Sequence, residues 1–287
     1  MTAPSFLEHC AELLCAYDLL LCDVWGVVHN GVAAYPDACE ALRRAREQGG
    51  TVLLISNSPR PYESIVPQLD AVGVPRASYA GVVTSGDVTR AVVAARRGQS
   101  VFHLGPPRDL PIFAGLEARL TDAKTADYVV CSGLFDDTKE TPEDYRDLLQ
   151  GLKDRRLFMV CANPDVVVER GDSLVYCAGA LADLYHSLGG EVLYAGKPHR
   201  PIYERALAQA ETLRGGKVPL DRVLAIGDSV RTDLQGAAAL GVDFLFLTSG
   251  IHAGEIGAGG DPQPEDLAKF FDRAGLMPKA AMHRLVW

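Results

Sequence analysis

Residues 19–28, LLLCDVWGVV, decide the fold because they place a charged side chain directly after a run that must be buried. Consecutive apolar residues such as Leu19 to Cys22 are typical of a strand covered on both faces in a parallel sheet. Asp23 follows within the same apolar run. We therefore expect Asp23 at the carboxyl end of a buried strand, which is where open α/β sheets bind ligands.

Short apolar runs alternate with helix-periodic segments along the rest of the chain. A helix is predicted from Pro36 to the Gly49-Gly50 pair, and a second strand follows at 51–55. Further strands are predicted at 101–104, 128–131, 157–161, 191–195, 223–226 and 244–247, and further helices at 142–156, 181–188, 201–214 and 234–240. This alternation predicts an α/β fold with a mainly parallel sheet.

Composition excludes several classes of protein. With 287 residues, 48% of them apolar, the chain can form one large domain or a core with an inserted second domain. A net charge of −9 without any Lys/Arg-rich run argues against nucleic acid as a partner. No window approaches the roughly 20 apolar residues of a membrane helix, and the N-terminus lacks the pattern of a secretory signal. The seven cysteines, without a metal-binding spacing, predict reduced, buried thiols in a cytoplasmic protein.

Polar residues follow four of the predicted strands. They are Asp23, Ser56-Asn57, Lys197 and Asp228. Phosphoryl transfer requires a nucleophile, a cation and hydrogen-bond donors aimed at the developing charge, and this set supplies all three. Taken singly, each has a structural interpretation as a turn residue, a helix cap or a solvated lysine. Their occurrence together at strand ends favours a common site.

These segments also resemble a known family. DVWGVV (23–28), SNS (56–58), GKP (196–198) and GDSVRTD (227–233) resemble, in this order, the four motifs of the haloacid dehalogenase superfamily. CANPD (161–165), AGAL (178–181) and the stretch from GKP to Leu207 resemble its class IIA, NagD-like branch. The resemblance implies a Rossmann-like parallel-sheet core at 1–81 and 193–287 with an inserted α/β cap at 82–192. It also implies a Mg²⁺-dependent phosphatase for a small phosphorylated metabolite, such as a sugar phosphate or a nucleotide monophosphate, and leaves a homodimer open.

The resemblance assigns a role to each motif residue. Asp23 would attack phosphorus and form an aspartyl-phosphate, which water then hydrolyses. Mg²⁺ would be held by the Asp23 carboxylate, the backbone carbonyl of Trp25 and the Asp228 carboxylate. Asp233 would orient the site or bind the metal through water.

The remaining motif residues would contact the substrate. Ser56, the Asn57 backbone and Lys197 would hold the phosphate oxygens. Asn163 and Asp165 resemble the cap motif, so they are candidate substrate-binding residues, and an Asn-Pro turn is the equal alternative.

Trp25 departs from the family pattern. Most phosphatases of this superfamily have there a second aspartate that protonates the leaving oxygen, which is worth about 10²–10⁴ in rate, or about 3–5 kcal/mol. We expect Trp25 to pack in the core because it follows a strand that must be covered; stacking on a substrate ring is the alternative. We expect His29 to be a surface residue in a polar turn; the alternative is that it replaces the missing proton donor.

Two other functions compete with phosphatase activity. The replacement of the aspartate by Trp25 raises the hypothesis of a catalytically weakened protein that binds a phosphometabolite and regulates a partner. Displacement at carbon, as in dehalogenases, ranks last because the GKP and GDSVRTD segments resemble the phosphatase branch.

The missing aspartate generates a kinetic prediction. Without a proton donor, the rate should fall steeply as the pKa of the leaving group rises, with aryl phosphates far ahead of alkyl phosphates. Values of kcat/KM across a series of phosphate esters would measure this slope. A flat dependence would mean that another residue, such as His29, supplies the proton.

Overall fold

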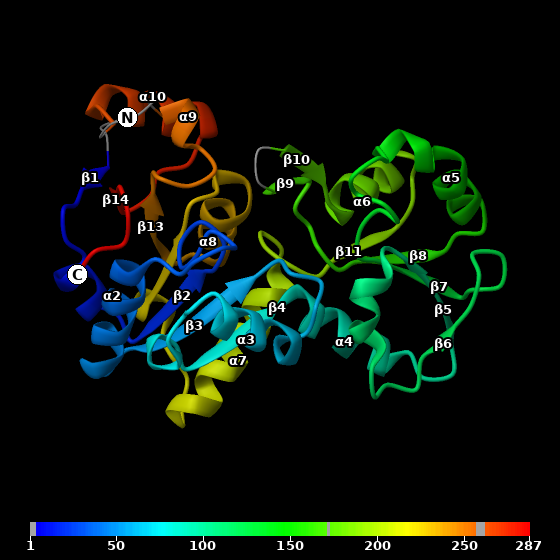
Figure 1. The fold of residues 1–287 in the computed structure, drawn as a ribbon, viewed down its shortest axis with the longest axis horizontal. Coiled ribbons are helices and arrows are strands. Elements are labelled where there is room, and N and C mark those ends of the chain that lie inside the picture. The colour runs from blue at the N-terminus through cyan, green and yellow to red at the C-terminus, as the bar shows by residue number, and fades with distance from the viewer. Residues whose placement is uncertain (1–3, 171–172, 257–261) are drawn as a thin grey trace. The chain divides into compact units, whose positions relative to one another are not determined.

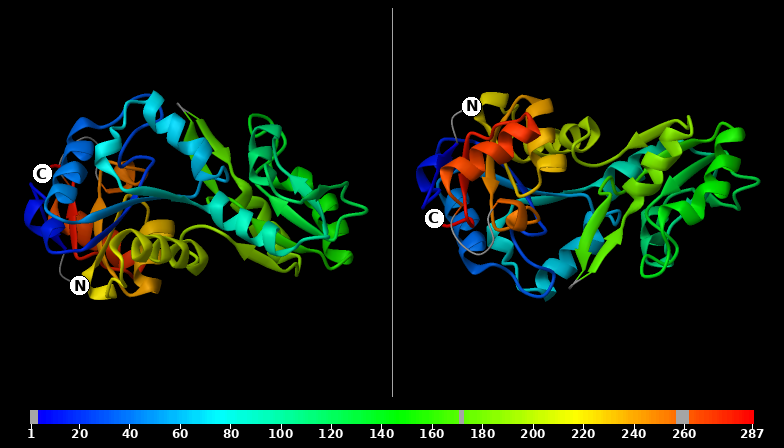
Figure 2. Two further views of the ribbon diagram at one scale, coloured as in Figure 1. Left: turned by 90° about the horizontal axis from the view of Figure 1, so that it is seen from below. Right: turned by 90° about the horizontal axis from the view of Figure 1, so that it is seen from above.

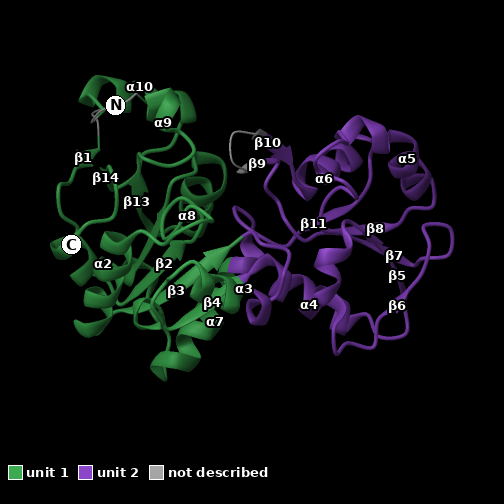
Figure 3. Ribbon diagram, in the orientation of Figure 1, with its two compact units in different colours: residues 1–56, 66–83, 203–287 green, residues 57–65, 84–202 purple. Residues whose placement is uncertain are grey.

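The computed structural model describes residues 4–170, 173–256 and 262–287. The chain divides into two compact units (Figure 3). The first contains residues 1–56, 66–83 and 203–287, and the second contains 57–65 and 84–202. Compared with the predicted core and cap, residues 57–65 and 193–202 group with the second unit, and residues 82–83 group with the first. Each unit therefore has its own sheet and its own hydrophobic interior.

The first unit is built on a seven-stranded sheet with the order β1-β14-β13-β12-β2-β3-β4 (Figure 1). Its strands are β1 (Ser5–Phe6), β2 (Leu19–Asp23), β3 (Thr51–Ser56), β4 (Gly81–Thr84), β12 (Val223–Gly227), β13 (Asp243–Leu247) and β14 (Ala280–Met282). The chain runs from β2 outward to β4 in one direction and from β12 outward to β14 in the other. The direction of winding reverses between β2 and β12, which is the position where open α/β sheets bind ligands.

Helices cover both faces of this sheet (Figure 2). They are α1 (Ala11–Cys15), α2 (Pro36–Glu47), α3 (Tyr62–Ala71), α7 (Arg200–Arg214), α8 (Gln235–Leu240), α9 (Ala253–Ile256) and α10 (Pro264–Ala274). Helix α2 buries Ala38, Ala41, Leu42 and Ala45. These positions recur with the helical period, so the predicted apolar face is the buried one.

Strand β2 occupies the centre of the sheet and is buried along its whole length. It ends at Asp23, although the apolar run that predicted it continues to Val28. The chain turns because Gly26 has a φ of +81° and the Val28 N–H donates to the Val24 carbonyl at 2.9 Å. The residues after Asp23 therefore form a loop at the carboxyl edge of the sheet.

The second unit has a five-stranded sheet of parallel pairs with the order β11-β8-β7-β5-β6. Its elements are β5 (Ser100–Leu104), β6 (Arg119–Leu120), β7 (Tyr128–Cys131), β8 (Phe158–Cys161), β11 (Val192–Tyr194), the antiparallel pair β9 (Val167–Arg170) and β10 (Ser173–Tyr176), and the helices α4 (Ser85–Ala95), α5 (Arg146–Asp154) and α6 (Ala178–Ser187). Leu149 and Leu152 of α5 pack with Leu181 and Tyr185 of α6 in a cluster that includes residues of β7 and β8. Two helices thus cover one face of this sheet.

All seven cysteines are free, and six of them are buried. Burial raises the pKa of the Cys10 thiol to about 12, so this side chain stays protonated. Cys15 is exposed, which differs from the prediction of buried thiols; in the short helix α1 it is the neighbouring Leu14 that is buried. Among the helices of the described residues, none has the length and apolarity to span a membrane.

Because β2 lies at the centre of the sheet, we expect shortening one of its buried side chains to reduce the stability of the protein strongly. Leu21 is 1% exposed, so Leu21→Ala would leave a cavity between the sheet and its helices. We expect a loss of about 2–5 kcal/mol in the free energy of unfolding, measured by urea denaturation. Val32→Ala is the control because that side chain is 83% exposed. Equal stability of the two variants would contradict the central role of β2.

Candidate active site

Strands β2, β12 and β3 are neighbours, and their carboxyl ends carry three predicted residues of the first unit. Cys22 of β2 pairs with Ile226 of β12, so Asp23 and Asp228 follow the paired ends of the two strands. Asp23 itself pairs with Ile55 of β3, and Ser56 ends that strand. The sheet register therefore brings Asp23, Asp228 and Ser56 to one edge, as the motifs predicted.

Asp233 joins this edge through a π-helical turn at Val230–Leu234. Its carboxylate accepts a hydrogen bond from the Ser229 backbone N–H at 3.2 Å. One carboxylate oxygen from each of Asp23, Asp228 and Asp233 lies within 4.8 Å of the other two, and all three residues are buried. Carboxylates held this close repel one another, and a divalent cation between them would offset that repulsion. The donor set of three carboxylate oxygens fits a hard cation such as Mg²⁺.

Two glycines allow the chain to approach Asp228 closely. A Cβ atom on Gly26 or on Gly250 would overlap with the Asp228 carboxylate. The Ile251 backbone N–H also donates to Asp228 Oδ2 at 3.1 Å. The carboxylate is therefore enclosed by backbone from the loop after β2 and from the loop after β13.

The contribution of residues 250–252 was missed by the sequence analysis. His252 Nε2 accepts a hydrogen bond from the Val230 N–H at 3.2 Å, at the first residue of the turn that carries Asp233. The only available signal was their position just beyond a predicted strand, since Ile251 acts through its backbone. This loop supports both Asp228 and the turn of Asp233.

The prediction that Trp25 packs in the core is wrong. Its side chain is 50% exposed. Core packing would require the strand to continue through Trp25. It ends at Asp23 and the chain turns at Gly26, so the indole lies outside the protein interior. The indole contacts the His29 ring edge-on, with ring centroids 5.4 Å apart, and packs over Gly31.

The prediction that His29 is a surface residue is also wrong, because only 9% of it is exposed. Its Nδ1 accepts a hydrogen bond from the Gly31 N–H at 2.8 Å, which requires an unprotonated Nδ1. Burial also lowers the pKa of the imidazole, so the neutral form is favoured near pH 7. His29 thus stabilises the loop under Trp25 and is poorly suited to donate a proton.

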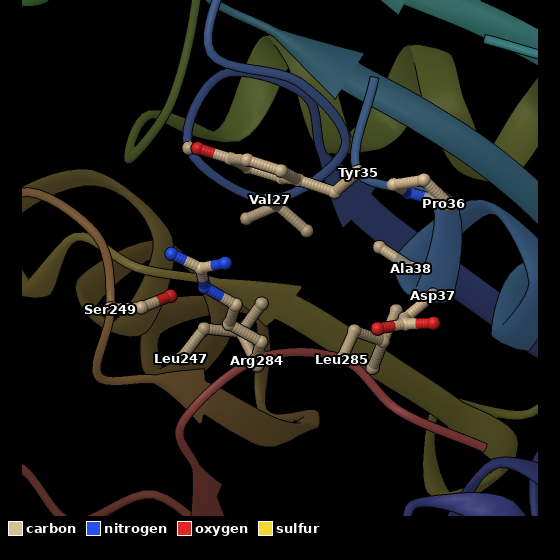
Figure 4. A pocket seen from close by; sticks show the side chains of 10 residues that line it. Val27, Tyr35, Pro36, Asp37, Ala38, Leu247, Ser249, Arg284 and Leu285 are labelled. Atoms are coloured by element: carbon tan, nitrogen blue, oxygen red, sulfur yellow. The ribbon is translucent and has the colours of Figure 1, made fainter. Parts of the chain in front are cut away.

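The loop after β2 ends at Tyr35, and Arg284 from far along the chain contacts it there. A small pocket is lined by Gly26, Val27, Tyr35, Pro36, Asp37, Ala38, Leu247, Ser249, Arg284 and Leu285 (Figure 4). Within it the Arg284 guanidinium lies over the Tyr35 ring, 5.4 Å from the ring centroid. This cation–π contact ties the chain after β14 to the residue that precedes α2.

In the second unit, Asn57 and Lys197 form a compact pair of buried residues. The Asn57 carboxamide accepts a hydrogen bond from the Lys197 N–H at 2.7 Å and donates to the Lys197 carbonyl at 3.0 Å. It also donates to Asp165 Oδ1 at 2.9 Å. A Cβ atom on Gly196 would overlap with Asn57, so glycine is required before the lysine. The Asn57 side chain thus fixes the backbone that carries the Lys197 ammonium.

The cap-motif residues are partly used in local structure. Asn163 Oδ1 accepts a hydrogen bond from the Asp165 N–H at 3.1 Å, which is the geometry of an Asx turn. This contact agrees with the alternative interpretation of these residues as an Asn-Pro turn. A substrate contact by Asn163 or Asp165 remains a prediction.

Comparisons with known proteins agree with the geometry. A model of haloacid dehalogenase-like hydrolases matches residues 20–118, and a second model of haloacid dehalogenase-like hydrolases matches residues 194–273. A solved haloacid dehalogenase-like hydrolase from Brucella suis 1330 is 48% identical, covers 99% of this chain and 100% of its own, and has a TM-score of 0.84.

Two further proteins are more distant. The 5'-nucleotidase YutF of Bacillus subtilis (strain 168) is 25% identical over 239 residues, which are 82% of this chain and 88% of that protein. A solved glycerol phosphate phosphatase from Mycobacterium tuberculosis, in complex with magnesium, is 20% identical, covers 99% of this chain and 78% of its own, and has a TM-score of 0.67. The match to the Brucella protein extends over the full length of both chains. The chain therefore belongs to the haloacid dehalogenase-like hydrolases, the family that its four motifs predicted.

Proposed function

We propose that this protein is a Mg²⁺-dependent phosphatase that hydrolyses a small phosphorylated metabolite, of the sugar phosphate or nucleotide monophosphate class, through an aspartyl-phosphate. The observation that carries the proposal is the convergence of Asp23, Asp228 and Asp233 within 4.8 Å at the carboxyl edge of the sheet. The similarity to a 5'-nucleotidase supports a phosphate ester as the substrate.

In this mechanism Asp23 is the nucleophile. One Asp23 carboxylate oxygen forms a bond to phosphorus while the bond from phosphorus to the leaving oxygen breaks, and the electron pair stays on that oxygen. Water then attacks phosphorus, releases inorganic phosphate and restores the Asp23 carboxylate. Mg²⁺ held by Asp23, Asp228 and the Trp25 carbonyl, with Asp233 in support, would neutralise charge on the phosphate oxygens.

The remaining predicted residues would hold the phosphate. We assign this role to the Ser56 hydroxyl, the Asn57 backbone and the Lys197 ammonium. The hydrogen bonds between the Asn57 side chain and both backbone groups of Lys197 support the assignment, because a lysine on a fixed backbone loses less entropy when it binds an anion. Asn163 and Asp165 would contact the rest of the substrate.

We further assign residues 1–81 and 193–287 to the catalytic core and 82–192 to the cap, in a cytoplasmic protein. A second candidate function is regulatory binding of a phosphometabolite without efficient turnover. Two observations favour it, namely the Trp25 side chain in place of a carboxylate and the engagement of His29 Nδ1 by the Gly31 N–H.

Substitution of the nucleophile separates these functions. Asp23→Asn should reduce phosphate release from a metabolite panel with Mg²⁺ by roughly 10³-fold or more, because an amide cannot form the phosphoenzyme. Asp147→Asn is the control, since it makes the same charge change at an exposed position of α5. If wild type and Asp23→Asn were equally inactive but bound the same phosphate esters in calorimetry, the binding function would replace the phosphatase.

The contact of Gly26 with Asp228 predicts a loss of metal binding. Gly26→Ala would push a methyl group into the Asp228 carboxylate, so we expect Mg²⁺ affinity to fall by about 10–100-fold in calorimetry. Gly73→Ala is the matched control because Gly73 has a similar φ of +86° and no atom within 4 Å of its Cβ position. Both variants bear the same backbone strain, so unchanged Mg²⁺ affinity in Gly26→Ala would exclude Asp228 from the metal site.

A further inference from the structure

The exposed indole of Trp25 has a fixed position. Large aromatic side chains normally bury 150–250 Å² each, and Trp25 remains 50% exposed. A Cβ atom on Gly31 would overlap with the six-membered part of the indole, so the ring lies directly against the backbone at Gly31. The His29 ring makes a second, edge-on contact with the indole, at an interplanar angle of 78°. The indole is therefore held by its own loop while part of its surface faces solvent.

The backbone of Trp25 lies next to the groups that are proposed to react in the first unit. It lies two residues after Asp23, and the next residue, Gly26, is in contact with the Asp228 carboxylate. An ester whose phosphorus is bound at Asp23 directs its leaving group away from that carboxylate, because the attacking and leaving oxygens are in line. The indole is the first large side chain on the loop that follows the nucleophile.

The chemistry of this side chain restricts the leaving group in two ways. Indole has an N–H donor but no group that can act as an acid near neutral pH, so the leaving oxygen departs with its negative charge. A leaving group that delocalises this charge into a conjugated ring departs most easily. A planar ring is also the group that stacks on indole. Both restrictions select the same class of compound.

We propose that Trp25 is a specificity-determining residue that stacks on a planar, conjugated leaving group, so that a planar leaving group binds more tightly than a non-planar one of similar size. This inference rests on the proposed phosphatase function. When Asp23 attacks, the bond from phosphorus to the ring oxygen breaks, the oxygen keeps the electron pair as a phenolate, and a proton is taken from water after release.

Binding of non-hydrolysable analogues tests the stacking directly. Phenylphosphonate and cyclohexylphosphonate have rings of similar size, but only the first is planar. With Mg²⁺ present, the wild-type protein should bind phenylphosphonate about 2- to 10-fold more tightly in calorimetry. Trp25→Phe should keep most of this ratio, and Trp25→Leu should bring it to about 1. Val32→Ala, at an exposed side chain of the same loop, should keep the wild-type ratio.

Fluorescence provides a second readout that does not depend on turnover. The chain has two tryptophans, so Trp287→Phe leaves Trp25 as the single indole. Phenylphosphonate should change the Trp25 emission with the dissociation constant found by calorimetry. Equal affinity for both phosphonates, affinity for neither, or a ratio that survives in Trp25→Leu would overturn the inference.

Kinetic measurements distinguish the effect of stacking on Trp25 from the effect of the missing proton donor. Phenyl phosphate should be compared with a fluorinated alkyl phosphate whose alcohol has a matched pKa, because both then need the same proton assistance. We expect a 2- to 10-fold lower KM for phenyl phosphate in the wild type and no difference in Trp25→Leu.

The two proposals can fail separately. Asp23-dependent turnover with no preference for the ring would remove the stacking inference and leave the phosphatase. A preference for phenylphosphonate without hydrolysis of any ester would remove the phosphatase, and with it the leaving-group role, and would leave Trp25 only as a residue that binds a planar ring.

Discussion

The structure depends on the adjacency of β2 and β12 at the centre of the seven-stranded sheet. Both strands are fully buried, β2 ends at Asp23 and β12 is followed by Asp228, so two carboxylates meet where the winding of the sheet reverses. Asp233 adds a third from the following turn. Carboxylates held this close repel one another, and the divalent cation proposed for this edge of the sheet would offset that repulsion.

The orientation of the Asp228 carboxylate depends on backbone that packs closely around it. Gly26 and Gly250 leave no room for side chains, and the Ile251 N–H holds one carboxylate oxygen. These contacts come from the loops after β2 and β13, which lie on either side of β12 in the sheet. The orientation of the carboxylate is thus set by backbone groups, which have fewer alternative positions than side chains.

The loop after β2 carries a half-exposed aromatic side chain at position 25. His29 and Gly31 form a compact support, with the imidazole nitrogen used as an acceptor, and the indole of Trp25 lies on it. Arg284 holds the far end of the loop at Tyr35. The side chain of Trp25, two residues after Asp23, is therefore half exposed and takes no part in the hydrophobic core.

The sequence by itself determined the α/β class, most strand positions and the strand-end residues Asp23, Ser56 and Asp228. These follow from local patterns, since apolar runs mark buried strands and parallel strands end at one edge. Only the tertiary structure decided that β2 ends at Asp23, that Trp25 is exposed and that His29 is buried. Those outcomes depend on the turn at Gly26 and on the packing of Trp25, His29 and Gly31 against one another. Periodicity describes one face of one element, whereas burial in a loop is set by whatever the rest of the fold places against it.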